Sequence, residues 1–119
     1  MSPSGNEFLR HILDEISFLQ EQSAELDLNL FIKNEVLKRA FARSLSIIGE
    51  AAKHIPQETR LKSPNIEWTQ ITGIRDRLVH DYLEIDYEIV WEIVKNRLPE
   101  FKDAIKLLLS KNADDDITD

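Results

Sequence analysis

Apolar residues recur at spacings of three and four along most of the chain, which is the pattern that places them on one face of a helix. The first such stretch covers residues 5–23, and Ser4 with Glu7 forms a capping-box pattern at its start. Its apolar positions are Phe8, Leu9, Ile12, Leu13, Ile16 and Leu19. The sequence therefore predicts a long amphipathic first helix.

A second long helix is predicted from Asn34, a suitable N-cap, to Pro56, which cannot continue a helix. Between these two helices, the segment AELDLNLFIK predicts an irregular or short helical connection. The segment PQETRLKSPN, with two prolines, predicts a connector after the second helix. The apolar stripe of the second helix is Leu37, Phe41, Leu45, Ile48, Ala52 and Ile55.

Two further helices complete the pattern. The third is predicted to begin near Glu67 or Trp68, and the fourth follows Asp86 and is kinked or split in two by Pro99. The apolar face of the fourth is Val90, Ile93, Val94, Leu98, Phe101, Ile105 and Leu108. No alternating segment is long enough to require a strand. We therefore expect an all-α fold, an antiparallel up-and-down bundle of four to five helices.

The bulk composition fits one soluble domain. The chain has 119 residues, of which 42% are hydrophobic and 31% are charged, and this is enough to bury a core. We expect residues 1–111 to form the helical domain and residues 112–119 to form a disordered acidic tail. The chain has no cysteine, no membrane-spanning apolar run and no signal-peptide pattern, so we expect a cytoplasmic protein without a membrane partner.

The net charge of -7 restricts the function. A protein that binds nucleic acid mainly through its phosphates usually has a basic surface. An RNA-directed role in this chain therefore requires a local basic patch or a partner.

The stretch GIRDRLVHDY contains residue types that suit phosphodiester chemistry. Arg75 lies five positions before His80, and Tyr82 follows two positions after that histidine. On one straight helix Arg75 and His80 would point about 140° apart, whereas Asp76 and His80 could touch. Arg75 and His80 can meet if the helix ends near Val79 or His80, or if two copies of the motif face each other across a dimer.

Such a pair could cleave RNA without a metal ion. An imidazole, whose ordinary pKa is about 6.5, exchanges protons at neutral pH, and a guanidinium binds two phosphate oxygens at once. The ribose 2′-OH would attack the adjacent phosphorus, with His80 as acid or base and Arg75 stabilising the phosphate charge. Asp76 could orient His80. Taken alone, such a pair is more often part of a solvated helix face, so both interpretations stay open.

Over residues 5–110 the chain resembles the HepT-like ribonuclease toxins of the HEPN superfamily. The resemblance lies in IEWTQITGIRDRLVHDYLEIDYEIVWEIVKNRLPE and in the earlier RAFARSLSIIGEAAKHIP. The family pattern is an arginine, a polar residue, a histidine and a tyrosine, which here are Arg75, Asp76, His80 and Tyr82. The polar residue is often asparagine in the family, so Asp76 adds a negative charge beside the phosphate site.

The resemblance implies an all-helical homodimer in which two motifs face each other in a cleft and form one composite ribonuclease site. Arg75 and His80 would be catalytic, with no metal ion or cofactor. It also implies the toxin of a type II or VII toxin–antitoxin system that cleaves RNA, with tRNA and mRNA both open, and not DNA. The usual antitoxin is a minimal nucleotidyltransferase, which can transfer AMP to the tyrosine, here Tyr82.

The predicted second helix carries a polar stripe beside its apolar one. Arg43, Glu50 and His54 lie on this stripe. Arg43 and Glu50 could line the cleft or hold Arg75 in place. The alternative is an exposed polar face with a Glu50–His54 pair four residues apart, and this alternative better explains His54.

Gly49 stands inside the same predicted helix, where glycine costs about 1 kcal/mol relative to alanine. The simplest explanation is close packing of helices within one chain. The more specific explanation is a contact across a dimer.

Three functions remain open from the sequence. The first is the endoribonuclease, which the complete set of Arg75, His80 and Tyr82 favours. The second is a non-catalytic helical docking subunit for a minimal nucleotidyltransferase, which the acidic composition and Asp76 favour. The third is a structural four-helix interaction protein. The three histidines are scattered without ligand spacing, so we expect no metal site.

Overall fold

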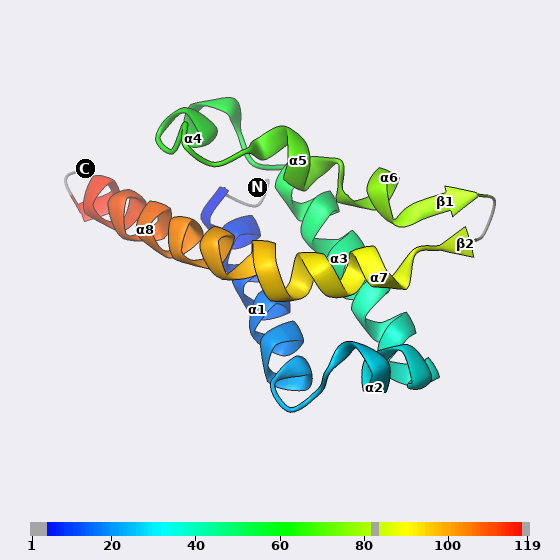
Figure 1. Cartoon of the computed structure of the whole chain (residues 1–119). Coiled ribbons are helices and arrows are strands. Elements are labelled where there is room, and N and C mark those ends of the chain that lie inside the picture. Colours follow the sequence, from blue (N-terminus) through cyan, green and yellow to red (C-terminus); the bar gives the residue numbers. More distant parts are fainter. Residues whose placement is uncertain (1–4, 82–83, 118–119) are drawn as a thin grey trace.

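The computed structural model describes residues 5–81 and 84–117, with only the backbone described at residues 80, 81 and 113–117. This part of the chain forms helices and one small β-hairpin (Figure 1). The elements in chain order are α1 (Gly5–Ser23), α2 (Leu28–Lys33), α3 (Glu35–Lys53), α4 (Gln57–Leu61), α5 (Trp68–Thr72), α6 (Ile74–Leu78), β1 (Val79–Asp81), β2 (Glu84–Ile85), α7 (Tyr87–Glu92), the π-helical turn η1 (Ile93–Arg97) and α8 (Leu98–Ile117).

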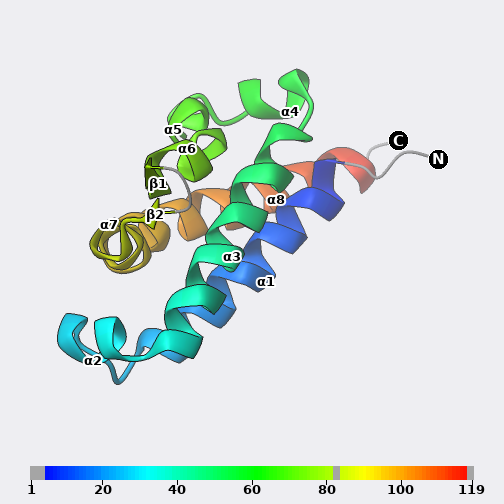
Figure 2. The same ribbon diagram turned by 90° about the vertical axis from the view of Figure 1, so that its right-hand side faces the viewer.

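The long helices α1 and α3 lie side by side and antiparallel, and the continuous rod of α7, η1 and α8 packs across them (Figures 1 and 2). Each of these elements buries the apolar face that its periodicity predicts. The core residues they share include Leu9, Ile12, Ile16, Leu19, Phe41, Leu45, Ile48, Val90, Ile93, Leu98 and Ile105. The predicted all-α helical bundle is therefore confirmed.

Side-chain caps begin two of these helices at the predicted residues. The side-chain oxygen of Asn34 accepts a hydrogen bond from the Leu37 amide at 3.0 Å, at the start of α3. The carboxylate of Asp86 accepts from the amides of Glu88 and Ile89 at 3.1 and 3.2 Å, at the start of α7. Such caps satisfy amides that have no partner inside the helix, which is why both helices begin where they do.

Pro99 neither splits the last helix nor ends it. The turn before it is a π-helix, in which the amide of Leu98 donates to the carbonyl of Ile93. Proline lacks an amide hydrogen and its ring clashes with the preceding turn of an α-helix. A wider turn at Ile93–Arg97 absorbs this misfit, and α8 continues beyond it.

The third predicted helix ends next to Val79, which is one of the two options stated above for bringing Arg75 and His80 together. It begins at Trp68 as predicted, is interrupted at Gly73, and ends at Leu78. The strands β1 and β2 follow as an antiparallel pair, with Val79 opposite Ile85. This hairpin was not expected from the sequence, because strands of two and three residues are too short to produce an alternating pattern.

Two segments that were expected to be irregular contain helix. The short α4 lies within the connector PQETRLKSPN, directly after Pro56. The backbone of residues 112–117 continues α8, where a disordered tail was expected. No glycine or proline follows Pro99 in the sequence, so no strong stop signal ends that helix earlier. The division into a domain of residues 1–111 and a tail stays a prediction, and residues 118–119 lie outside the described part.

Gly49 lies where α3 touches the segment that carries the motif. A Cβ atom at this position would be 3.3 Å from the carbonyl oxygen of Ile71 and 3.8 Å from the Cβ of Ile74. Ile71 and Ile74 belong to α5 and α6 of the same chain. The simpler of the two explanations for this glycine, close helix packing, is therefore confirmed.

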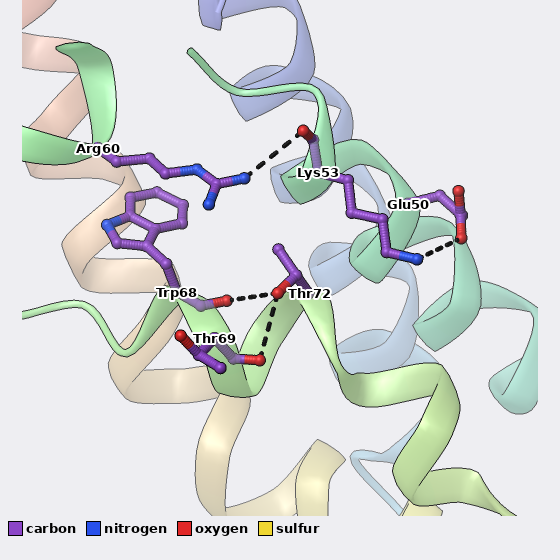
Figure 3. Close-up of polar contacts among 6 residues, drawn as sticks. All are labelled: Glu50, Lys53, Arg60, Trp68, Thr69 and Thr72. Atoms are coloured by element: carbon purple, nitrogen blue, oxygen red, sulfur yellow. Dashed lines mark hydrogen bonds and ion pairs between the residues drawn. The ribbon is translucent and has the colours of Figure 1, made fainter. Parts of the chain in front are cut away.

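Arg60 connects the end of α3 to the start of α5 (Figure 3). Its guanidinium donates to the carbonyl of Ala52 in the last turn of α3 at 2.9 Å and to the carbonyl of Ile55, just after the helix, at 3.2 Å. The same group lies 5.7 Å from the ring centre of Trp68, and the indole of Trp68 donates to the carbonyl of Ser63 at 3.2 Å. These contacts hold the connector and fix where the motif segment begins.

Replacing Gly49 with leucine tests the close approach of α3 to α5 and α6. Leucine is the better helix former by about 0.8 kcal/mol, so a net loss of stability must come from steric overlap with Ile71 and Ile74. We expect the free energy of unfolding in urea to fall by about 1–3 kcal/mol. Arg39→Leu, at an exposed position of the same helix, should leave it nearly unchanged. A Gly49→Leu protein as stable as wild type would contradict this packing.

Candidate functional site

The motif begins on a one-turn helix whose apolar residues anchor it to the core. Ile74 and Leu78 of α6 are buried, and the three residues between them, Arg75, Asp76 and Arg77, are exposed. The helix is interrupted at Gly73, with φ -91° and ψ 7°, so α6 begins as a separate turn after α5. Three charged side chains are thus presented from a short turn that the core holds at both ends.

The helix ends directly after the arginine-bearing turn. Val79 has φ -88° and ψ 112°, which is extended backbone, and the amide of Asp86 donates to the carbonyl of Leu78 at 2.9 Å. The backbone of His80 therefore belongs to strand β1, and not to the helix that carries Arg75. The separation of about 140° that a straight helix would impose does not apply here. The side chain of His80 and all of Tyr82 lie outside the described residues.

A depression of about 420 Å³ lies on the surface between α1, α3 and α6. It contains Arg75 from the motif together with Arg43 and Glu50, for which lining a cleft was one of the options left open by the sequence. The structure brings these three side chains together from sequence positions far apart. The complete lining is Phe8, His11, Arg43, Ser46, Ile47, Glu50, Ala51, His54 and Arg75.

Two exposed guanidinium groups give this depression a local positive charge. Neither Arg43 nor Arg75 forms a hydrogen bond or ion pair with another described side chain. Glu50 is engaged with Lys53, whose amine lies 3.2 Å from its carboxylate (Figure 3). The predicted option that Glu50 holds Arg75 by an ion pair is therefore not what the structure has. Within the described residues, no side chain therefore occupies the donors of either arginine.

His54 also lines the depression, although its sequence position was explained by solvation. Its ring stacks on Phe8 of α1, with centroids 5.1 Å apart and planes inclined by 15°. The predicted Glu50–His54 pair is replaced by this stack and by the Glu50–Lys53 contact. The sequence held one signal for this role, since His54 lies on the same helical stripe as Arg43 and Glu50.

Asp76 is exposed on α6 and does not line the depression. Among the residues that the structure describes, no group of three or more histidine, aspartate or glutamate side chains is arranged to hold a metal ion. Within the same residues, no helix is both long and apolar enough to cross a bilayer.

Comparisons with known proteins support the resemblance seen in the sequence. The family described as "Ribonuclease HepT-like" matches residues 12–108. The chain is 43% identical to "Putative RNase TTE0752" of Caldanaerobacter subterraneus subsp. tengcongensis over 104 residues, which is 87% of this chain and 93% of that protein. It is 38% identical to "Putative RNase MJ1380" of Methanocaldococcus jannaschii over 101 residues, 85% of this chain and 93% of that protein.

A third relative carries the family name itself. The chain is 32% identical to "Probable ribonuclease HepT" of Thermococcus cleftensis over 108 residues, which is 91% of this chain and 98% of that protein. No solved structure gives a significant match. The matched region contains the arginine-bearing turn and all the residues that line the depression except Phe8 and His11, and the chain therefore belongs to the HepT-like ribonuclease family.

Proposed function

We propose that this chain is a metal-independent endoribonuclease and the toxin of a toxin–antitoxin system. The observation that carries the proposal is Arg75, an exposed arginine of a HepT-like chain that shares a depression with a second exposed arginine, Arg43, and neither has a partner among the described side chains. This arrangement supplies the local basic patch that an RNA-directed role requires in a chain with a net charge of -7.

The proposed reaction needs only groups that this chain carries. The ribose 2′-OH attacks the adjacent phosphorus, the bond from phosphorus to the 5′ oxygen breaks, and a 2′,3′-cyclic phosphate remains. A histidine removes the proton of the 2′-OH or supplies one to the leaving 5′ oxygen, and His80 takes this role. Arg75 binds the phosphate oxygens while negative charge builds on them. Asp76 supports the orientation of His80.

A homodimer completes the proposed site. One histidine cannot be base and acid in the same step, whereas two copies of His80 facing each other provide one of each. Arg75 is exposed at the surface and can therefore contact a phosphate that is shared between two subunits. Arg75 and His80 could be brought together by the end of the helix or by a dimer. These two arrangements are compatible with each other.

The proposed antitoxin is a minimal nucleotidyltransferase that transfers AMP from ATP to Tyr82. The tyrosine oxygen attacks the α-phosphorus of ATP, and pyrophosphate leaves with the proton balance carried by solvent. The product places an anionic phosphodiester and an adenosine two residues from His80. Added charge and bulk at this position oppose the approach of an RNA phosphate.

A cleavage assay on total cellular RNA in the presence of EDTA tests the enzyme. We expect wild-type protein to cut and His80→Ala to lose at least about 100-fold in rate, because acid–base catalysis contributes about 10²–10⁴. Circular dichroism and sedimentation should show the same helix content and oligomeric state for both proteins. If unmodified, folded wild-type protein does not cut, the chain is the docking subunit for a nucleotidyltransferase instead.

Arg75→Ala and Arg77→Ala form a matched pair, because both arginines are exposed on the same turn of α6 and only Arg75 lines the depression. We expect Arg75→Ala to lower the cleavage rate by about 100-fold or more, the magnitude typical of a lost oxyanion donor. Arg77→Ala should stay within a few-fold of wild type. Equal losses in the two variants would assign the effect to general charge, and not to a contact of Arg75.

Mass spectrometry after incubation with a cognate nucleotidyltransferase and ATP tests the modification. We expect one added AMP on Tyr82, and Tyr82→Phe should accept none. Tyr87→Phe is the control, since Tyr87 is the other tyrosine of the chain and its half-buried ring lies 4.6 Å from the amine of Lys38. AMP on a residue other than Tyr82 would contradict the proposed acceptor.

A further inference from the structure

The stacked pair of Phe8 and His54 lies at one end of the depression that contains Arg75. Phe8 comes from the first turn of α1, and His54 is the C-cap of α3, so the pair joins the ends of two antiparallel helices. The amide of His54 donates to the carbonyl of Ala51 at 3.1 Å, which fixes the backbone below the ring. The His54 ring is thus held in one plane before any ligand arrives.

We propose that this depression is a binding subsite for single-stranded RNA, in which His54 stacks on a nucleobase and Arg43 binds a phosphate farther along the same strand. The inference rests on the proposed ribonuclease function and names the part of the substrate that this face recognises. Phe8 covers one face of the His54 ring, and the exposed His54 side chain leaves the opposite face for a ligand. A ring that is already ordered loses little entropy when it stacks on a base.

The arrangement of charges along α3 fits a nucleotide chain. Arg43 precedes His54 by eleven residues, which is about 16 Å along a helix axis. The depression therefore runs between a phosphate-binding group at one end and a stacking ring at the other, with Arg75 entering from α6. Both guanidinium groups lack a partner among the described side chains, and a guanidinium matches phosphate oxygens in a bidentate manner.

The floor of the depression fits the faces of bases. Ala51 is buried and Ile47 is half-buried between the polar side chains of the same helix. An apolar floor with a few charged groups at its rim is the usual composition of a ligand site. In a duplex the base faces are covered by their neighbours, whereas bases of an unpaired strand can stack on protein rings. The site therefore favours unpaired RNA over a duplex.

Binding of an uncleavable probe separates this subsite from catalysis. The probe is a short, fluorescent 2′-O-methyl oligoribonucleotide, which has no 2′-OH to attack phosphorus, and its affinity is read by fluorescence anisotropy with the full chain. We expect His54→Ala to weaken binding about 5- to 100-fold, the range for one base stacked on an aromatic side chain. His54→Phe keeps a ring and should restore most of the affinity.

An abasic probe of the same length provides the sharper control. It keeps the sugar–phosphate chain and lacks bases, so wild type and His54→Ala should bind it equally, whereas Arg43→Ala should weaken its binding. Arg39→Ala is the matched control for Arg43, because Arg39 is exposed one turn earlier on α3 and does not line the depression. The melting temperature of each variant shows whether a loss of binding is due to a loss of folding stability.

The outcomes distinguish this subsite from the proposed ribonuclease. If His54→Ala weakens binding only when bases are present, the subsite is supported, even for a protein that does not cut RNA. If RNA is cut in a His80-dependent reaction while His54→Ala binds both probes like wild type, the subsite is wrong and the ribonuclease stands. If wild type binds neither probe and His54→Ala instead weakens capture of a nucleotidyltransferase, the depression is a protein-docking surface and the inference is overturned.

Discussion

The close approach of α3 to the α5–α6 segment at Gly49 is the constraint on which the candidate site depends. With no side chain at this position, the carbonyl of Ile71 and the side chain of Ile74 lie directly against the helix. Arg75 follows Ile74 immediately, so the depth at which Ile74 packs decides where the guanidinium lies relative to Arg43. A larger residue would move the whole turn outward and separate the two charges. Glycine has a poor helix propensity, but at this position the lack of a side chain lets Ile74 pack close to α3 and brings Arg75 next to Arg43.

The helices could be predicted from the sequence because their information is local. The stripes of α1, α3 and α8 repeat over many residues, and the caps at Asn34 and Asp86 act within one turn. The hairpin of β1 and β2 could not be predicted, because its strands are too short to alternate and the bond that closes it, from the Asp86 amide to the Leu78 carbonyl, involves only backbone atoms. Pro99 marked a disturbance in the last helix, but the sequence did not indicate that a π-helical turn would absorb it and let the helix continue.

The candidate site also has residues that could be predicted from the sequence and residues that could not. Arg43 and Glu50 could be selected from the sequence because they share a helical stripe, and the position of Arg75 beside them required the fold. The stack of His54 on Phe8 was missed, because it joins residues 46 positions apart in the sequence, and no spacing rule on one helix can indicate such a contact. His54 considered alone was reasonably assigned to solvent. Its place in the lining of the depression follows from its contact with the Phe8 ring, and helix periodicity does not identify that contact.

The acidic composition, which argued against an RNA-directed protein, restricts how RNA could be bound. Two exposed arginines in one depression neutralise few phosphates, so counterion release can supply only a modest part of the affinity and a shallow dependence on salt. The remainder must come from contacts that do not depend on net charge, and stacking on an ordered ring is such a contact. A net charge of -7 also repels duplex nucleic acid, whose charge is dense, more than a short unpaired segment. The overall charge and the local site therefore favour the same kind of substrate, unpaired RNA held by a few specific contacts.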